Sequence, residues 1–293
     1  MMKAYSVLAI LLSITSLLKA QDSLTNNLAV NQKRLKTLII AGGAGYGLTL
    51  YGLNKLWYND SERQSFQFFD DNDEWKQVDK LGHFYSAFYF SYGTSKALQW
   101  CNVPNKKSDL YGALTGFLVM VPIEILDGYS DAYGASSGDL IADAGGALFY
   151  LGQTMLWKEP RILPKFSFHT THYATMRPEV LGNDYSSEML KDYNGQTYWL
   201  SFDMDKFIKF PKWLNIAAGY GAEGMVYAND QSNKAMGYNS YRQYYFSLDP
   251  DLTAIRTNSK VLKTLLFCVS LIKLPSPTVE FSSQGTRFSF FYF

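Results

Sequence analysis

Ionisable residues lie inside apolar helical sequence between residues 79 and 153, and this feature constrains the fold more than any other. A carboxylate or imidazole that is buried without a partner costs several kcal/mol, so such residues need partners or a wet cavity. We therefore predict that they meet in space as one polar cluster. The predicted cluster consists of Asp79, Lys80, His83, Glu124, Asp127, Ser137, Asp139 and Asp143.

Helical spacing places members of the polar cluster on shared helix faces. Residues three or four positions apart in a helix are neighbours on its surface. Residues 136–139 also fit the capping-box pattern, in which Asp139 would only satisfy backbone N–H groups at a helix start. The pairs with helical spacing are Asp79 with His83, Glu124 with Asp127, and Asp139 with Asp143.

Three interpretations of the polar cluster are open. It is a buried hydrogen-bonded network that fixes the register of the helices, a site for a metal ion or another ligand, or a catalytic site with His83 as acid or base. We favour the structural network, because structural ion pairs perturb ionisable groups just as active sites do. The sequence identifies no cofactor and no particular metal, and an enzyme is the less favoured interpretation.

The N-terminal residues 1–20 have the layout of a secretory signal peptide. Lys3 precedes an apolar run over residues 4–18, and Ala20 stands before a polar segment. This layout predicts export, with cleavage after Ala20 and a mature protein that begins at Gln21. An uncleaved membrane anchor is the alternative. No cysteine follows the apolar run, so the sequence does not indicate a lipid-anchored N-terminus.

The composition favours a protein that meets a membrane and disfavours one that binds nucleic acid. The formal net charge is +1, which gives no electrostatic reason to bind nucleic acid. Aromatic residues make up 16% of the chain, which favours β-structure with aromatic faces or a membrane boundary. We expect the partners to be a membrane, the outer membrane in preference, and other envelope proteins or a lipid.

The first half of the chain predicts a bundle of about four apolar helices, which we assign to a domain over residues 21–158. In the last three helices the uncharged runs are about 12 to 14 residues long, shorter than the roughly 20 that a membrane span needs. A bundle beyond the inner membrane is therefore favoured over a four-span protein within it. Pro122 is expected to kink the third helix just before Glu124. The four helices are expected at 36–55, 79–100, 108–127 and 137–157.

The second half, residues 159–293, predicts an antiparallel β-rich domain, so the fold class is α+β. Polar and aromatic residues alternate there with a period of two, and the chain ends on aromatic residues as outer-membrane strands do. Weak strands in 160–195 and 228–240 would complete a barrel-like sheet; the alternative is an open sheet packed on the helices. An apolar helix is expected at 259–275, and strands at 165–174, 196–205, 213–228, 241–249 and 278–293.

The ordered polar residues also carry a family resemblance over roughly residues 75–157. The pattern combines Asp79-Lys80-x-x-His83, Glu124 followed by Asp127, and Ser137-x-Asp139 before a helix of small residues. It resembles the periplasmic lipoprotein family of unknown function that includes the enterobacterial YfiM protein, and more distantly the VanZ-like proteins linked with glycopeptide resistance. The resemblance implies an envelope protein with a compact helical core and no assigned reaction. We expect a structural or binding component associated with the outer membrane. The alternative is an inner-membrane VanZ-like protein that binds or modifies a lipid-linked or cell-wall-related ligand.

Overall fold

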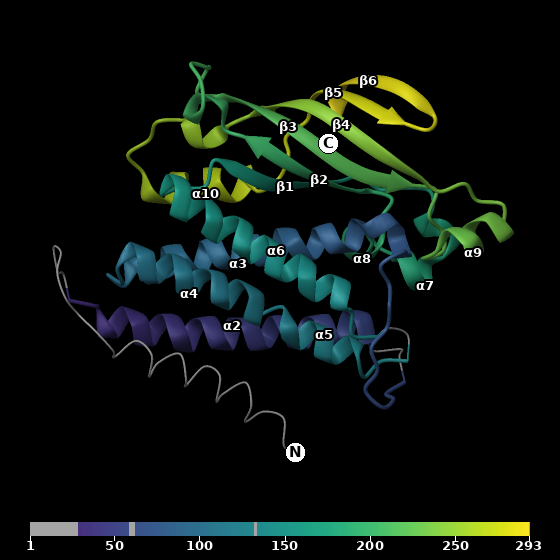
Figure 1. The fold of residues 1–293 in the computed structure, drawn as a ribbon, viewed down its shortest axis with the longest axis horizontal. Helices are drawn as coiled ribbons and strands as arrows, with labels where there is room; N and C mark the ends of the chain where they lie inside the picture. Colours follow the sequence, from purple (N-terminus) through teal and green to yellow (C-terminus); the bar gives the residue numbers. More distant parts are fainter. Residues whose placement is uncertain (1–28, 59–61, 132–133, 293) are drawn as a thin grey trace.

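Helices from the first half of the chain form one layer, and a six-stranded antiparallel sheet from the second half lies over them (Figure 1). This computed structural model describes residues 29–58, 62–131 and 134–292. The predicted signal peptide at 1–20 and its cleavage site lie outside the described residues. The predicted α+β class, with N-terminal helices and a C-terminal sheet, is confirmed.

The helical layer contains one helix more than the sequence predicted, because the stretch expected at 108–127 is broken. Its first part ends at Leu118, and Pro122 lies in the first turn of the second part. Proline is tolerated there because the first-turn N–H groups have no helical acceptor. The break therefore falls just before Glu124, as predicted. The helices of this layer are α2 (Gln32–Tyr58), α3 (Val78–Trp100), α4 (Asn105–Leu118), α5 (Val121–Asp127) and α6 (Ser137–Trp157).

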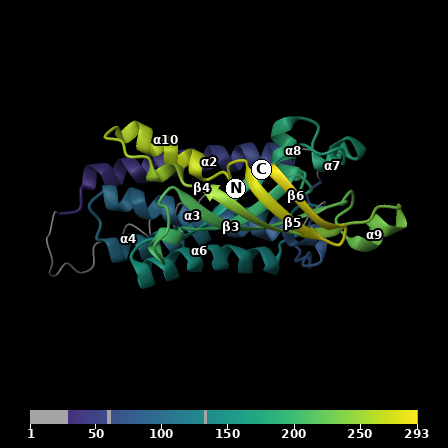
Figure 2. The same cartoon turned by 90° about the horizontal axis from the view of Figure 1, so that it is seen from above.

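Helix α3 lies at the centre of the molecule, where it packs against α4, against α6 and against the first strands of the sheet. Seen from above, α2 and α6 lie on opposite sides of α3 (Figure 2). Two glycines let the helix backbones come close. A Cβ atom on Gly116 would clash with Ser91, and one on Gly146 would clash with the carbonyl oxygen of Phe84. This close packing fixes the offset of α3 and α6 along their axes, and so determines which of their polar residues face each other.

Adding a methyl group at Gly116 is expected to destabilise the protein by about 1–3 kcal/mol, because α3 would have to move away from α4. Gly93, on α3, has nothing within 4 Å of the same added atom and serves as the matched control. Gly93→Ala is expected to leave stability unchanged or raise it by up to about 1 kcal/mol, since alanine favours helix. Urea unfolding of the two variants measures the difference. Equal stability of the two variants would contradict the close approach of α3 and α4.

The sheet is an open meander. Each strand pairs antiparallel with the next along the chain, and among the described residues β1 does not pair with β6. The barrel-like option is therefore not supported. The segment expected as one strand at 278–293 belongs to a hairpin whose turn leads into Gly285 at a φ of 114°. The strands are β1 (Ile162–Phe168), β2 (Gln196–Phe202), β3 (Leu214–Glu223), β4 (Tyr241–Pro250), β5 (Ser276–Ser282) and β6 (Gly285–Tyr292).

Apart from β1 at the start of the first stretch, residues 160–195 and 228–240 form short helices and loops and not the weak strands expected there. Asp184 accepts hydrogen bonds from the backbone N–H groups of Ser186 and Ser187, and Asn229 accepts one from Ser232. Such side chains cap helix starts and compete with strand formation. The helices of the second half are α7 (Pro178–Leu181), α8 (Tyr185–Lys191), α9 (Asp230–Ala235) and α10 (Lys260–Ser270).

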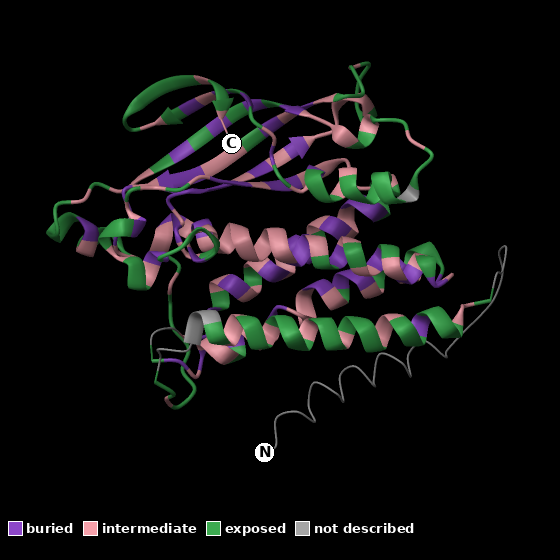
Figure 3. Cartoon of the chain, turned by 180° about the vertical axis from the view of Figure 1, so that it is seen from behind, coloured by how far each residue is buried: buried purple, intermediate pink, exposed green. Residues whose placement is uncertain are grey.

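The sheet buries many polar side chains, together with aromatic ones such as Trp199 and Tyr245, and leaves many apolar ones exposed, unlike a sheet whose core side is apolar. Along β4, the buried residues include Gln243 and Asp249, whereas Tyr244, Phe246 and Leu248 are exposed. Buried and exposed bands alternate along the strands in Figure 3. The inner face of the sheet is thus a second polar interior, separate from the predicted polar cluster.

Candidate functional site

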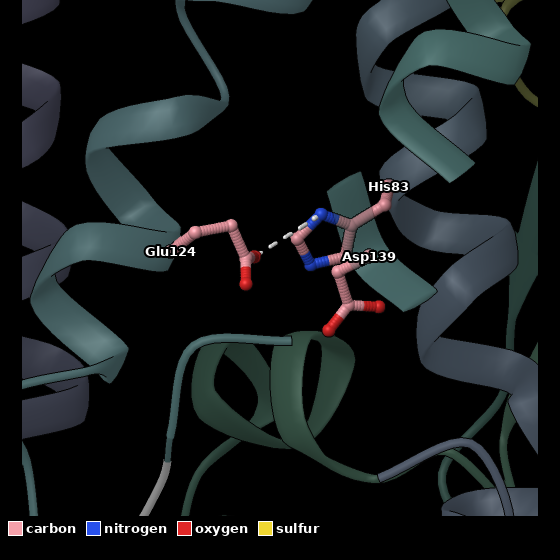
Figure 4. Close-up of side chains that lie close together, drawn as sticks. All are labelled: His83, Glu124 and Asp139. Atoms are coloured by element: carbon pink, nitrogen blue, oxygen red, sulfur yellow. Dashed lines mark ion pairs between the residues drawn. The ribbon is translucent and has the colours of Figure 1, made fainter. Parts of the chain in front are cut away.

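Three helices bring the predicted polar cluster together. Helix α3 supplies residues from its first two turns, α5 supplies Glu124, and the first two turns of α6 supply the remaining carboxylates (Figure 4). The side chains sit below the sheet, where α3 crosses the start of α6. The predicted residues that the structure brings together are Asp79, Lys80, His83, Glu124, Asp139 and Asp143.

The start of α6 is fixed by a hydrogen-bonded cap. The hydroxyl oxygen of Ser136 accepts a hydrogen bond from the backbone N–H of Asp139 at 3.1 Å, as the capping pattern predicted. The backbone N–H of Ser136 donates to Oε2 of Glu124 at 2.9 Å. Glu124 therefore ties α5 to the first turn of α6, which places its other carboxylate oxygen in the site.

The start of α3 follows a strained turn. Trp75, Lys76 and Gln77 adopt φ angles of 45°, 52° and 63°, a left-handed conformation that is uncommon for residues other than glycine. The Tyr220 hydroxyl, from β3, donates a hydrogen bond to the carbonyl oxygen of Lys76. The sheet thus holds the turn that aims Asp79 and its neighbours into the site.

The Lys80 ammonium group contacts three carboxylates. Its Nζ lies 2.9 Å from Asp71 Oδ1, 3.1 Å from Asp79 Oδ2 and 3.1 Å from Asp139 Oδ1. Burial by itself would lower the pKa of Lys80, but the charges of Asp79 and Asp139 outweigh burial and raise this pKa. Lys80 is therefore a fixed positive charge that joins α3, α6 and the segment before α3.

His83 faces a second set of carboxylates. Its Nδ1 lies 3.1 Å from Asp143 Oδ1 and 3.8 Å from Glu124 Oε1. Burial by itself would lower the pKa of His83. The hydrogen bond with Asp143 and the charges of Asp139, Asp143 and Glu124 together outweigh burial and raise the pKa to about 10. The imidazole is thus held in a strongly negative environment.

Burial raises the pKa of the acidic groups, whereas burial by itself lowers the pKa of Lys80. It raises the pKa of Glu124 to about 8 and that of Asp139 to about 6, and it also raises the pKa of Asp79. Burial acts in the same direction on Asp71, but hydrogen bonds from Ser136 and Lys80 outweigh it and lower that pKa. Glu124 and Asp139 therefore ionise less readily than ordinary carboxyl groups do.

Two predicted members of the cluster occupy its border. Asp127 is the last residue of α5, and its negative charge contributes to the raised pKa of Glu124. Ser137 is exposed, and Ser136 before it provides the cap. The sequence reasoning missed Asp71, and it named Ser136 only as part of a helix cap. Asp71 lies in the polar segment before α3, where no helical periodicity marks it; the only signal was its place in the acidic run at 70–73.

Two groups of side chains in the site have the types and spacing of metal ligands. One consists of Asp71, Asp79 and Asp139, and the other of His83, Glu124 and Asp139; in each group the ligand atoms lie within 4.8 Å of one another. Three buried carboxylate oxygens also lack a hydrogen-bond partner. They are Asp79 Oδ1, Glu124 Oε1 and Asp143 Oδ2.

Comparison with known proteins finds a family similarity for the part of the chain that builds this site. No curated protein and no solved structure matches the chain. Residues 67–153, less than a third of the chain, match the profile of one family, and they run from just before Asp71 to the last part of α6. This family is described as "Predicted periplasmic lipoprotein (DUF2279)", so the segment that carries the polar cluster is similar to a periplasmic lipoprotein family of unknown function, and the chain fits a cell-envelope protein of unassigned activity.

Proposed function

We propose that this protein is a structural or binding component of the cell envelope that associates with the outer membrane. The family similarity supports an envelope or periplasmic location. The observation that carries membrane association is the large number of apolar side chains that the folded chain leaves exposed. Extended exposed apolar surface on a protein marks a contact with a membrane or another protein.

The helical layer has such a surface on its outer sides. On α6, Ile141, Leu148 and Leu156 are between 63% and 74% exposed. On α2, which lies on the side of the layer away from the sheet (Figure 1), Ile40 and Leu48 are exposed to a similar extent. These side chains suit the boundary between lipid headgroups and acyl chains, into which amphipathic helices bury their apolar faces.

The sheet favours the outer membrane over the inner one. Its strands expose Phe246, Phe281 and Phe288, while Ser247 and Glu280, which neighbour two of them along the strands, are polar and buried. Strands of outer-membrane proteins show the same alternation, with apolar residues toward lipid and polar residues toward the interior. The lipid-facing character of these strands therefore supports the proposal independently of the helices.

A second candidate is an inner-membrane, VanZ-like protein that binds or modifies a lipid-linked or cell-wall-related ligand. One stretch of the described residues, Asn105–Asp127, is long and apolar enough to cross a membrane, with a mean hydropathy of 1.5. It favours this candidate by length and composition. The break between α4 and α5 lies within the same stretch, and such an interruption does not suit a continuous span.

Separation of the two membranes on a density gradient tests the proposal. We expect the full-length protein in the outer-membrane fraction. Replacing Leu148 and Leu156 of α6 together by glutamine is expected to shift a large part of it to the soluble fraction, because apolar contact with lipid is lost. Ile208→Gln, which changes an exposed apolar residue outside α2, α6 and the sheet, is the control and should leave the distribution unchanged. Recovery in the inner-membrane fraction would favour the second candidate.

A further inference from the structure

We propose that His83, Glu124 and Asp139 bind one divalent transition-metal ion. The proposal rests on the geometry of the polar cluster and is independent of which membrane the protein meets. The three side chains come from α3, α5 and α6, so they are far apart in the sequence and meet only in the fold. Their ligand atoms lie within 4.8 Å of one another. Ligand atoms that are each about 2.0–2.2 Å from a shared ion lie closer to one another than 4.8 Å. The three side chains would therefore draw together when the ion binds.

The Glu124 side chain is buried and incompletely satisfied. It is 3% exposed, and its Oε1 has no hydrogen-bond partner. Figure 4 shows this carboxylate directed at the imidazole of His83, with Asp139 on an adjoining side of the ring. A buried polar atom without a partner is destabilising, and such atoms in folded proteins indicate a missing ligand or ion. Glu124 Oε1 is therefore placed as a metal ligand.

Asp143 orients His83 for the same role. Nδ1 of His83 lies 3.1 Å from Asp143 Oδ1, and because a carboxylate accepts, Nδ1 is the nitrogen that donates in this hydrogen bond. Nε2 is then the nitrogen that would give up its proton and bind the ion. A metal-binding histidine usually donates its other ring N–H to a carboxylate, which fixes the ring and makes the ligating nitrogen more basic. Asp143 is fully buried and supplies that carboxylate. It is thus a positioning residue for His83.

The other candidate group of ligands already holds a cation. Asp71, Asp79 and Asp139 all contact the Nζ of Lys80, so an ammonium ion lies where a metal would have to bind. Among the described residues, the carboxylates nearest His83 have no comparable lysine or arginine partner. The His83 side of the cluster is therefore the side without a lysine or arginine counter-ion for Glu124 and Asp143, and Asp139, which belongs to both groups, contacts Lys80 through Oδ1. This asymmetry assigns the metal to one of the two groups.

The ligand types select the class of metal. Imidazole suits Zn²⁺ and other transition ions, whereas Mg²⁺ and Ca²⁺ prefer oxygen ligands alone. One imidazole and two carboxylates fit Zn²⁺ or Mn²⁺. Three protein ligands would leave a coordination position for water or for a bound ligand, as in metal sites that carry out chemistry.

Calorimetric titration of the chelator-treated full-length protein with Zn²⁺ and Mn²⁺ tests the proposal. We expect one ion per chain. His83→Gln should weaken binding at least 100-fold, and Asp143→Asn about 10- to 100-fold, since it only misaligns the imidazole. His172→Gln changes an exposed histidine away from the site and should bind as the wild type does. Binding of Mg²⁺ with equal affinity, or Zn²⁺ binding that His83→Gln leaves unchanged, would overturn the assignment.

A spectroscopic measurement on the wild type keeps the test valid even if a variant fails to fold. Co²⁺ bound to mixed nitrogen and oxygen ligands gives visible absorption whose intensity reports its coordination number. We expect such a band at one equivalent of Co²⁺, competed away by Zn²⁺, together with a rise in melting temperature on adding Zn²⁺. Absence of both the band and the rise in the stripped wild-type protein would exclude the metal site.

Discussion

Replacing Lys80 by methionine is expected to lower the free energy of unfolding by about 3–5 kcal/mol. The Lys80 side chain is only 12% exposed, and its ammonium group contacts Asp71, Asp79 and Asp139. Without it, three nearby carboxylates would repel one another in a buried site and would have to take up protons. The expected result is a large drop in the urea midpoint, without a change in the slope of the transition.

Two measurements make the Lys80 experiment specific. Lys96→Met changes an exposed lysine on the same helix and should alter stability by no more than about 0.5 kcal/mol. In Lys80→Met, the three carboxylates become an all-oxygen group with metal-ligand spacing. Added Ca²⁺ should then restore part of the lost stability, because Ca²⁺ prefers such ligands. An unchanged midpoint for Lys80→Met would show that the lysine contributes nothing to the network.

The helical half of the fold was predictable because its signals are local. Runs of uncharged, mostly apolar residues located α3 and α6, and the spacing of Asp79 with His83 and of Asp139 with Asp143 placed each pair on one face. Pro122 indicated the break before Glu124. Asp71 was not predictable, because it reaches Lys80 from a segment without periodicity through a left-handed turn that the sheet stabilises.

The polar cluster divides into a Lys80 side and a His83 side, and this division could not be predicted from the sequence. The sequence showed that the charged residues must be partnered, but Lys80 could have paired with any of the carboxylates. The rotamers in the structure direct it to Asp79, Asp139 and the unpredicted Asp71, and leave Glu124 to His83. Helical spacing specifies which side chains share a face, and only the packing of α5 against α6 specifies which faces meet.

The second half shows a different limit of sequence reasoning. Alternation along the strands was evident, but a period of two does not say which set of side chains is buried. The structure buries the polar set, and this choice rests on contacts between distant strands such as β1 and β4. Several aromatic side chains of the strands, such as Tyr244, Phe246 and Phe281, are exposed instead of buried in an apolar core. These exposed aromatic residues support the proposed contact with lipid.

Breaking the ion pair inside the sheet is the second large effect that we expect. Lys165 Nζ lies 2.6 Å from Asp249 Oδ2, and the two side chains are 2% and 0% exposed. Lys165→Met would leave the Asp249 carboxylate buried with only the hydroxyl of Ser201 as a hydrogen-bond donor to Oδ2. Loss of one partner of a buried pair costs about 3–5 kcal/mol. The cost here should lie toward the lower end of that range, because the charge of buried Lys273 still acts on Asp249.

The double variant Lys165→Met/Asp249→Leu decides what the ion pair contributes. Removing both charges leaves no carboxylate without its cation, and buried Lys273, whose pKa burial lowers to about 8 even beside Asp249, can give up its proton. The double variant should therefore be more stable than Lys165→Met and should regain much of the wild-type value. The coupling free energy from the complete cycle, measured by urea unfolding, should then be at least about 2 kcal/mol. The exposed pair of Arg177 and Glu179 is the control, and Glu179→Ala should cost at most about 1 kcal/mol. If the two changes at Lys165 and Asp249 were simply additive, the polar inner face of the sheet would not be held together by this pair, and its burial would depend on the hydrogen bonds of Ser201 and the neighbouring strands.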